Sequence, residues 1–362
     1  MSKSYMYDPL KPYNNLPLLP PRAEVETKRV LKEAIAAARI LGELKGRAKE
    51  TPNQSMLVNA ITLQEAKDSS EIENIVTTQD SLYKAFSGNV NTDDAQTKEV
   101  LRYRQALWEG FNNLDQRPLS TNTFISIVRT IKEIDLGIRN TLGTTISSNS
   151  KVIYTPPEGE QLIRDLLRNL EDFIHDGSDL DNLVKLAIMH YQFEAIHPFS
   201  DGNGRTGRVL NILFLVEKGL LDIPILYLSK HIIENKNQYY NKLRGVREND
   251  NWEEWILFIL QNVKETANYT LKKINAINLL MEETIELCKK SLPSRVYSKE
   301  LVELLFEQPY CKVKFIVDRG IAKRQTAAEY LREVEKIGVL KAQKVESENL
   351  FLNVGLFEIL KA

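Results

Sequence analysis

The sequence predicts a mainly α-helical protein, and three observations support this fold class. Apolar residues recur at three- and four-residue spacing along most of the 362 residues, as in amphipathic helices. Patterns typical of β-strands are confined to two short segments, residues 144–157 and residues 339–354. A chain of this length has ample core for two or three domains.

The predicted elements follow the breaks in the chain. Residues 1–22 are rich in proline and predict an extended segment. Helical periods dominate residues 24–86, and a mostly helical core follows. We therefore expect an N-terminal helical region over residues 1–96 and a core domain over residues 97–271.

The sequence pattern changes after Pro293. Three short helices and then a pair of alternating strands are predicted, over residues 298–306, 313–318, 325–337 and 339–354. Three helices followed by a β-hairpin form the profile of a winged helix, with Ile337-Gly338 as the break before the wing. We expect such a domain over residues 290–362.

The overall composition excludes several classes of protein. Charged residues make up 27% of the chain and the net charge is −1, so no global attraction to nucleic acid or to an anionic membrane exists. Cys288 and Cys311 lack metal-ligand spacing, which favours a reducing compartment over a disulfide or a zinc site. The N-terminus lacks the blocks of a signal peptide, and the apolar run at residues 210–216 is too short to span a bilayer. We expect a cytoplasmic protein with no membrane partner.

Residues 197–208, His-Pro-Phe-Ser-Asp-Gly-Asn-Gly-Arg-Thr-Gly-Arg, are the most informative stretch. An amphipathic helix ends near His197, Pro198 stops it, and a second helical period begins after Gly204. Free N–H groups at the start of that second helix, together with its dipole, favour a bound phosphate. Arg205 and Arg208 lie one turn apart on one face, where both guanidiniums can reach a single polyphosphate.

Two better-known phosphate motifs do not fit this stretch. Gly202, Gly204 and Gly207 match G-x-G-x-x-G, but the dinucleotide-binding fold requires a preceding β-strand, and here a helix precedes. The P-loop pattern G-x-x-x-x-G-K-[ST] is absent from this site.

The stretch resembles the signature of the Fic family, H-P-F-x-[DE]-G-N-G-R-x-x-R, at all nine specified positions. The resemblance implies a helical Fic core with a β-hairpin flap. It also implies the family's usual reaction, transfer of AMP from ATP to a Tyr, Thr or Ser hydroxyl of a target protein with release of pyrophosphate. His197 would then be the general base on that hydroxyl, and Asp201 would hold a Mg²⁺ that bridges the α- and β-phosphates.

The same resemblance assigns an ATP-binding role to most of the loop. Backbone amides around Gly202, Asn203 and Gly204 would cradle phosphate, with the Asn203 side chain donating to the α-phosphate. Arg205 and Arg208 would grip the β- and γ-phosphates, and Thr206 and Gly207 complete the ATP-binding stretch. Phe199 is expected to be an apolar anchor of the loop. His175, His190 and His231 lack comparable neighbours and are expected to be structural or surface residues.

A second segment, residues 62–75, is polar and helix-forming and contains Ser69-x-x-x-Glu73-Asn74. It resembles the family's inhibitory motif, [ST]-x-x-x-E-[GN], in the variant that lies N-terminal to the core. The resemblance implies that Glu73 pairs with Arg208 and so blocks the γ-phosphate site, with Ser69 on the same helix face as a tether for Glu73. For a pattern this short, a solvated charged face is the other interpretation. The same glutamate could activate water to remove AMP, which the sequence does not decide.

Two further elements fit the resemblance. Residues 144–157 carry β-branched residues around Ser-Ser-Asn-Ser, which predicts a hairpin. It is either a plain surface hairpin or the family's flap, whose edge takes a target segment by backbone pairing. Tyr240 matches the family position that contacts the adenine end of the nucleotide, whereas Tyr239 could face the core.

The winged-helix prediction leaves the partner open. Arg319, Lys323, Arg324 and Arg332 give its second and third helices some basic character, which favours DNA. Acidic residues dilute this cluster, and winged helices also dock proteins; the diluting residues are Glu329, Glu333 and Glu335.

Three functional classes therefore compete. The first is an AMP-transferase autoinhibited by Glu73, and the second is a Fic-fold transferase of phosphocholine, UMP or phosphate. Phosphorylating relatives have a lysine at the motif's second glycine, so Gly204 argues against phosphate transfer. The third is a DNA-binding regulator whose Fic-like core senses nucleotide, against which the intact His197 and Asp201 argue. The resemblance also implies a homodimer.

Overall fold

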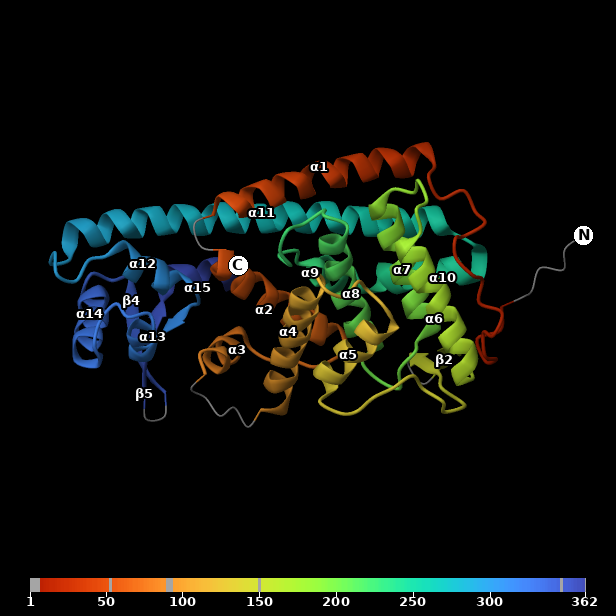
Figure 1. The fold of residues 1–362 in the computed structure, drawn as a ribbon, viewed down its shortest axis with the longest axis horizontal. Helices are drawn as coiled ribbons and strands as arrows, with labels where there is room; N and C mark the ends of the chain where they lie inside the picture. The colour runs from red at the N-terminus through yellow and green to blue at the C-terminus, as the bar shows by residue number, and fades with distance from the viewer. Residues whose placement is uncertain (1–6, 52–53, 89–93, 149–150, 346–347, 362) are drawn as a thin grey trace, which may run out of the picture.

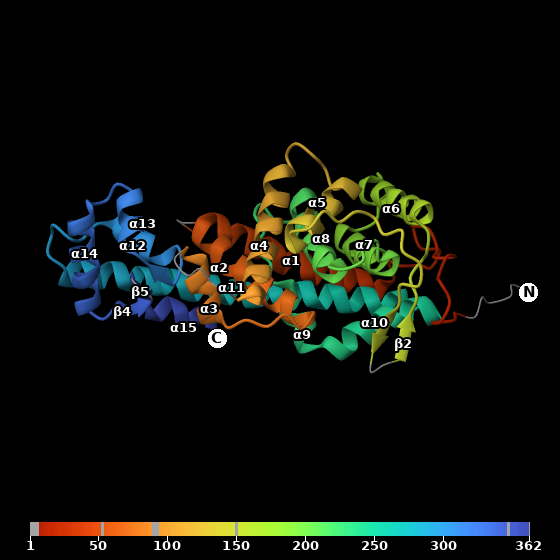
Figure 2. The same ribbon diagram turned by 90° about the horizontal axis from the view of Figure 1, so that it is seen from below.

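The predicted mainly α-helical class is confirmed. The computed structural model describes residues 7–51, 54–88, 94–148, 151–345 and 348–361. Within these residues the chain forms fifteen helices, a two-stranded sheet and a three-stranded sheet. Figures 1 and 2 show an elongated molecule with the C-terminal elements at one end and the N-terminal segment and the small hairpin at the other.

The N-terminal region and the core are built from eleven helices and one hairpin. The helices before the hairpin are α1 (Lys28–Glu50), α2 (Gln54–Ile72), α3 (Gln79–Phe86), α4 (Ala95–Asn113) and α5 (Thr121–Lys132). The hairpin consists of β1 (Ile146–Ser148) and β2 (Lys151–Tyr154). The helices after the hairpin are α6 (Glu160–His175), α7 (Asn182–Ile196), α8 (Asn203–Glu217), α9 (Leu228–Glu234), α10 (Lys236–Asn249) and α11 (Trp252–Ser291).

Helix α11 is the longest element of the structure and links the core to the C-terminal end (Figure 1). Its 40 residues extend over about 60 Å at 1.5 Å per residue. The predicted end of the core at residue 271 falls inside this helix, which continues without a break. The sequence carries no glycine or proline between Gly245 and Pro293 that would interrupt it.

Helix α1 packs along α11 in the same direction (Figures 1 and 2). Its buried side chains, which include Ala34, Ala37 and Ala48, recur at helical spacing, and their small size lets the two backbones approach closely. Two polar contacts between the helices fix their register: Arg29 pairs with Glu254 at 2.8 Å, and Arg47 donates to Asn275 at 2.7 Å.

The C-terminal residues contain the predicted three helices and hairpin together with two elements that the sequence did not indicate. The elements are α12 (Lys299–Phe306), β3 (Tyr310–Cys311), α13 (Val313–Asp318), α14 (Arg324–Lys336), β4 (Leu340–Val345), β5 (Glu348–Asn353) and α15 (Val354–Lys361). The sheet order is β3-β5-β4, and all pairs are antiparallel. Strand β3 and helix α15 were not predicted. Residues 346–347, which fall within the predicted strand pair, lie outside the described residues.

Helix α15 returns to the rest of the molecule and binds it by its last carbonyl groups. Leu360 O accepts from Gln64 of α2, from Gln79 of α3 at 3.2 Å and from Lys273 of α11 at 2.9 Å. The Tyr310 hydroxyl also donates to Asp80 at 2.5 Å. The C-terminal elements therefore rest directly on the helix that carries Ser69.

Among the residues that the structure describes, no helix combines the length and the apolar character needed to cross a lipid bilayer.

We predict that Trp255 of α11 contributes strongly to stability. Its side chain is fully buried, its indole N–H donates to Ala187 O at 2.7 Å, and its ring stacks on His190. Trp255→Ala should lower the free energy of unfolding by about 3–5 kcal/mol, measured by urea denaturation. Trp108, which is 38% exposed on α4, is the matched control. Equal losses for Trp255→Ala and Trp108→Ala would contradict this prediction.

Candidate active site

The motif forms the predicted joint between two helices. α7 ends at Ile196, and His197 follows with φ 50° and ψ 60°, a left-handed conformation that turns the chain out of the helix. Gly202 has φ 83°, and α8 begins at Asn203. A glycine is required at position 202 because a side chain would be strained at this φ.

The loop between the helices is closed by its own polar groups. The Asn203 side chain accepts from Phe199 N at 2.9 Å and donates to Phe199 O at 2.8 Å. The amide expected to contact the α-phosphate is therefore engaged in fixing the loop. Phe199 is fully buried and packs on Phe193, as expected of an apolar anchor.

His197 lies at the wall of a cavity of about 710 Å³. Desolvation and then the positive charge of Arg139 lower the pKa of His197 to about 4, although Glu73 and Asp201 act in the opposite direction. The imidazole is therefore neutral at physiological pH and retains a lone pair. Its Nδ1 is buried, with no hydrogen-bond partner among the described residues.

Arg208 is bound by the C-terminal end of α2. The guanidinium is buried, and its Nη2 donates to Glu73 Oε1 at 2.8 Å, which is the predicted ion pair. Its Nε donates to Ser69 Oγ at 2.7 Å and its Nη2 to Ser69 O at 2.8 Å. Ser69 thus binds the arginine directly, and no hydrogen bond between Ser69 and Glu73, the predicted tether, occurs among the described residues.

Glu73 stands just beyond α2, whose last residue is Ile72. Asn74 has φ 64° and ends the helix with a left-handed turn, which explains an asparagine at this position. Desolvation opposes ionisation of Glu73, but the charge and hydrogen bond of Arg208 outweigh it and lower the pKa of Glu73 below its usual value. The cavity therefore holds a carboxylate paired with Arg208.

Arg205 points toward a different set of charges. Its Nη1 donates to Glu99 of α4 at 2.7 Å, and Lys132 of α5 binds both Glu99 at 2.9 Å and Asp201 at 2.7 Å. The two guanidiniums expected to share one anion thus bind carboxylates on different helices. Glu99 and Lys132 were missed by the sequence analysis, since each lies within an ordinary amphipathic helix with no motif around it.

Two motif glycines mark close approaches between helices. A Cβ at Gly204 would stand 2.3 Å from Glu73 Oε1, and a Cβ at Gly207 would stand 2.8 Å from Glu194 Oε1. Glu194 also lines the cavity and was not singled out by the sequence, and desolvation raises its pKa to about 7. Thr206, which was expected to bind ATP, is fully buried and is not among the residues that line the cavity.

The remaining walls come from α10 and the hairpin. Tyr240 is 40% exposed and lines the cavity, whereas Tyr239 is buried and bonds His190 at 2.8 Å. Strands β1 and β2 contribute Ile146 and Ile153 to the rim. The predicted hairpin is confirmed, although its turn at residues 149–150 lies outside the described residues.

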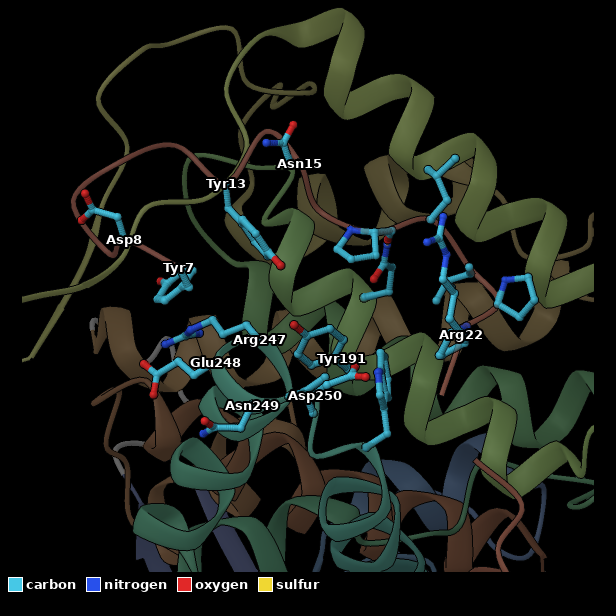
Figure 3. A pocket seen from close by; sticks show the side chains of 18 of the residues that line it. Tyr7, Asp8, Tyr13, Asn15, Arg22, Tyr191, Arg247, Glu248, Asn249 and Asp250 are labelled. Atoms are coloured by element: carbon cyan, nitrogen blue, oxygen red, sulfur yellow. The ribbon is translucent and has the colours of Figure 1, made fainter. Parts of the chain in front are cut away.

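A larger cavity of about 1180 Å³ adjoins this one but contains none of the motif residues (Figure 3). Tyr7 and Tyr13 of the N-terminal segment line one side, and Glu248 and Asp250 at the end of α10 line the other. Acidic and basic side chains are mixed along its wall, without a cluster of one charge that would bind a ligand of opposite charge. We therefore place the candidate active site in the smaller cavity beside His197.

Family models match three consecutive parts of the chain. The model for the Fic/DOC family N-terminal region matches residues 31–112, and the model for the Fic/DOC family matches residues 97–215. The model described as protein adenylyltransferase SoFic-like, C-terminal domain, matches residues 280–356.

Curated relatives resemble part of the chain. A probable protein adenylyltransferase of Aquifex aeolicus is 35% identical over 95 residues, which is 26% of this chain and 27% of that protein. Protein adenylyltransferase fic-1 of Caenorhabditis elegans is 34% identical over 89 residues, 24% of this chain and 16% of that protein. The match thus spans about a quarter or less of these relatives.

Solved structures share the fold over more of the chain. A Fic family protein from Desulfovibrio desulfuricans aligns with a TM-score of 0.61 at 18% identity, over 92% of this chain and 98% of that one. A Fic domain containing signaling protein from Bacteroides thetaiotaomicron aligns with a TM-score of 0.54 at 19% identity, over 66% of this chain and 98% of that one. The chain thus contains, in this order, regions that match the Fic/DOC family N-terminal model, the Fic/DOC family model and the SoFic-like C-terminal domain model.

Proposed function

We propose that this protein is an adenylyltransferase that moves AMP from ATP to a hydroxyl side chain of a target protein, and that Glu73 holds it in an inhibited state. The observation that carries the proposal is the bond between Glu73 and Arg208 inside the cavity that His197 lines. The base, the anion-binding arginine and the group that occupies it are thus within one cavity. The names of the curated relatives support the same reaction.

His197 suits the role of general base by its charge state and its exposure to the cavity. A neutral imidazole can accept the proton of an incoming hydroxyl as the oxygen attacks the α-phosphate. A pKa near 4 makes a weak base, but bound phosphates bring negative charge beside the ring and raise the pKa toward neutrality. The base is therefore strongest when the nucleotide is present.

The N-terminus of α8 and Arg208 provide the phosphate site. Asn203 and Gly204 begin the helix, so their N–H groups have no carbonyl partner within it and can donate to phosphate. Arg208 provides a planar fork for the γ-phosphate, and Glu73 now occupies it. A triphosphate would have to displace Glu73 before it could bind with its α-phosphate in line for attack.

Asp201 has the donor chemistry that Mg²⁺ prefers. Its side chain is 61% exposed, and the charge and hydrogen bond of Lys132 outweigh desolvation and lower its pKa, so it is ionised. The described residues hold no group of three or more His, Cys, Asp or Glu side chains fit to ligate a metal, which suits an ion bound mainly by one carboxylate, phosphates and water. When bound, the ion would neutralise charge on the phosphates, and Lys132 would have to release Asp201.

The β1–β2 hairpin is the proposed docking edge for the target. It forms part of the cavity rim close to His197. Ile153 O of β2 accepts from Tyr7 and Arg247, so β1, the other edge strand of this two-stranded sheet, is the proposed edge for backbone pairing. Backbone pairing would place a target hydroxyl at the cavity mouth without selecting a particular sequence.

We predict that Glu73→Gly activates AMP transfer because it frees the Arg208 fork. Incorporation from α-labelled ATP, followed by intact mass, should rise at least about tenfold, the change expected from about 1.4 kcal/mol of lost inhibitory contact. Adding His197→Ala should lower the rate of the Glu73→Gly protein about 10²–10⁴-fold, to the wild-type level or below it. Labelling by CDP-choline or UTP in place of ATP would contradict the assignment of AMP and favour another Fic-fold transferase.

Ser69→Ala should activate less than Glu73→Gly. It removes one of three hydrogen bonds to Arg208, while Ser69 O and Glu73 still bind the guanidinium. Ser70→Ala is the matched control, because Ser70 is equally buried and its hydroxyl has no partner among the described residues. The same labelling assay should give the order Glu73→Gly, Ser69→Ala, and then Ser70→Ala equal to wild type. Activation by Ser70→Ala would show a general loosening of α2 instead.

Asp201→Asn, in the Glu73→Gly protein, should raise the Mg²⁺ concentration needed for half-maximal AMP transfer by about tenfold. The effect is limited because the phosphates and water would bind the ion together with the one carboxylate. Asp222→Asn, which alters a surface pair with Lys45, is the control. An unchanged Mg²⁺ dependence would remove Asp201 from the metal site.

A further inference from the structure

Arg139 is a buried charged residue that no motif indicates. It lies between α5 and the hairpin and is 4% exposed. Among the described residues it forms no ion pair with a carboxylate, and its guanidinium is directed at backbone carbonyl groups instead. Burying an unpaired guanidinium costs several kcal/mol unless its donors are satisfied. The presence of an arginine at this buried position therefore calls for an explanation from its contacts.

The contacts of Arg139 join three parts of the site. Its Nε donates to His197 O at 2.7 Å, and its backbone N–H donates to Pro198 O at 2.9 Å. Its Nη2 donates to Ile196 O at 3.4 Å and to Pro157 O, three residues beyond β2. One side chain thus links the end of α7, the start of the motif loop and the return of the hairpin.

His197 needs such an external constraint. Its backbone is left-handed, which is unfavourable for a residue with a Cβ by about 1–3 kcal/mol. It also follows the last turn of α7, where the terminal carbonyl groups carry the negative end of the helix dipole. A guanidinium placed on the carbonyls of residues 196 and 197 satisfies both groups and holds this conformation.

We propose that Arg139 is a positioning residue for the transfer step, fixing the peptide of His197 and the base of the hairpin in one arrangement so that the base meets the docked hydroxyl. The inference rests on the proposed AMP transfer. It assigns to Arg139 no contact with ATP or target, and its effect is transmitted through His197 and the hairpin.

The position of Arg139 also bears on the protonation of His197. The charges that act on the imidazole are Arg139, which favours the neutral ring, and Glu73 and Asp201, which favour the protonated ring, together with the Glu194 backbone. Removing the Arg139 charge should therefore raise the pKa of His197. With a raised pKa, the imidazole becomes protonated at a higher pH and can then no longer accept a proton. The pH below which the rate falls should therefore be higher.

The test uses the Glu73→Gly protein with Arg139→Met, which keeps the length and removes the charge, and with Arg139→Lys, which keeps the charge and loses the fork. The matched control is Arg104→Met on α4, where a half-buried guanidinium binds Asn59 and covers Phe86 away from His197. The readouts are kcat, KM for ATP, the pH–rate profile and the titration of His197 by histidine NMR without nucleotide or Mg²⁺.

We expect Arg139→Met to lower kcat about 100-fold, the usual effect of a misplaced catalytic group, with KM for ATP changed less than about threefold. The acid limb of its pH–rate profile and the His197 titration should both move to higher pH. Arg139→Lys should restore part of kcat and return the acid limb to the pH found without a change at Arg139. Arg104→Met should move none of these.

Three outcomes would overturn the proposal. The first is a fall in kcat for Arg139→Met that is matched by Arg104→Met. The second is an unchanged His197 titration, which is measured without any activity and so tests Arg139 even if no AMP transfer is found. The third outcome concerns the case in which Arg139→Met does not fold, so that the test rests on Arg139→Lys. Full activity of Arg139→Lys, which lacks the planar fork, would refute a positioning role of the guanidinium. A Glu73→Gly protein that transfers no AMP, with a normal His197 shift, would instead remove the proposed function.

Discussion

The organisation of this molecule depends on the buried guanidinium of Arg208. A charge in that position must have partners, and all three of its hydrogen bonds come from the last turn of α2 and the residue beyond it. The end of α2 is therefore fixed against α8, and the left-handed Asn74 directs the chain away so that Glu73 can reach into the cavity. Gly204 leaves room for the same contact, because a Cβ there would overlap the present position of the Glu73 carboxylate and force it to shift.

In the proposed function, the Glu73 carboxylate and the γ-phosphate compete for the Arg208 guanidinium. Glu73 is tethered to the protein, so it competes without the entropic cost that a free nucleotide incurs on binding. Lys236 of α10 adds to this by donating to Ile72 O at 2.6 Å, which fixes the last peptide of α2. Under this proposal, a signal that weakens either contact would favour nucleotide binding without changing the catalytic groups. Inhibition and catalysis would then be separable, although both depend on Arg208.

The sequence predicted those parts of the fold and site that have a local signature. The joint between α7 and α8 follows from the His-Pro-Phe break and the two glycines, and the hairpin follows from its β-branched residues. The pairing of Glu73 with Arg208 came from motif resemblance, and the structure contains that pair as a single bond from Nη2 to Oε1. Partners from ordinary helices were not predictable, because nothing local distinguishes Glu99, Lys132 or Glu194 from solvent-facing charges. Ser69 was placed on the correct face, but one helix gives no information on which neighbour its hydroxyl meets.

The unbroken course of α11 has a consequence for how the chain can vary. An α-helix advances by about 100° per residue, so inserting or deleting one residue between the core and α12 would rotate everything beyond it by more than a quarter turn. The contacts of Leu360 with Gln64 and Gln79, and of Tyr310 with Asp80, would then face away from their partners. A whole-turn insertion would restore the phase but would displace these groups by about 5.4 Å along the helix axis, which also breaks the contacts. Helix α11 therefore has to keep its length, in contrast to a flexible linker, which accepts any length. The length of this single helix thus determines whether the C-terminal elements can reach their partners on α2 and α3.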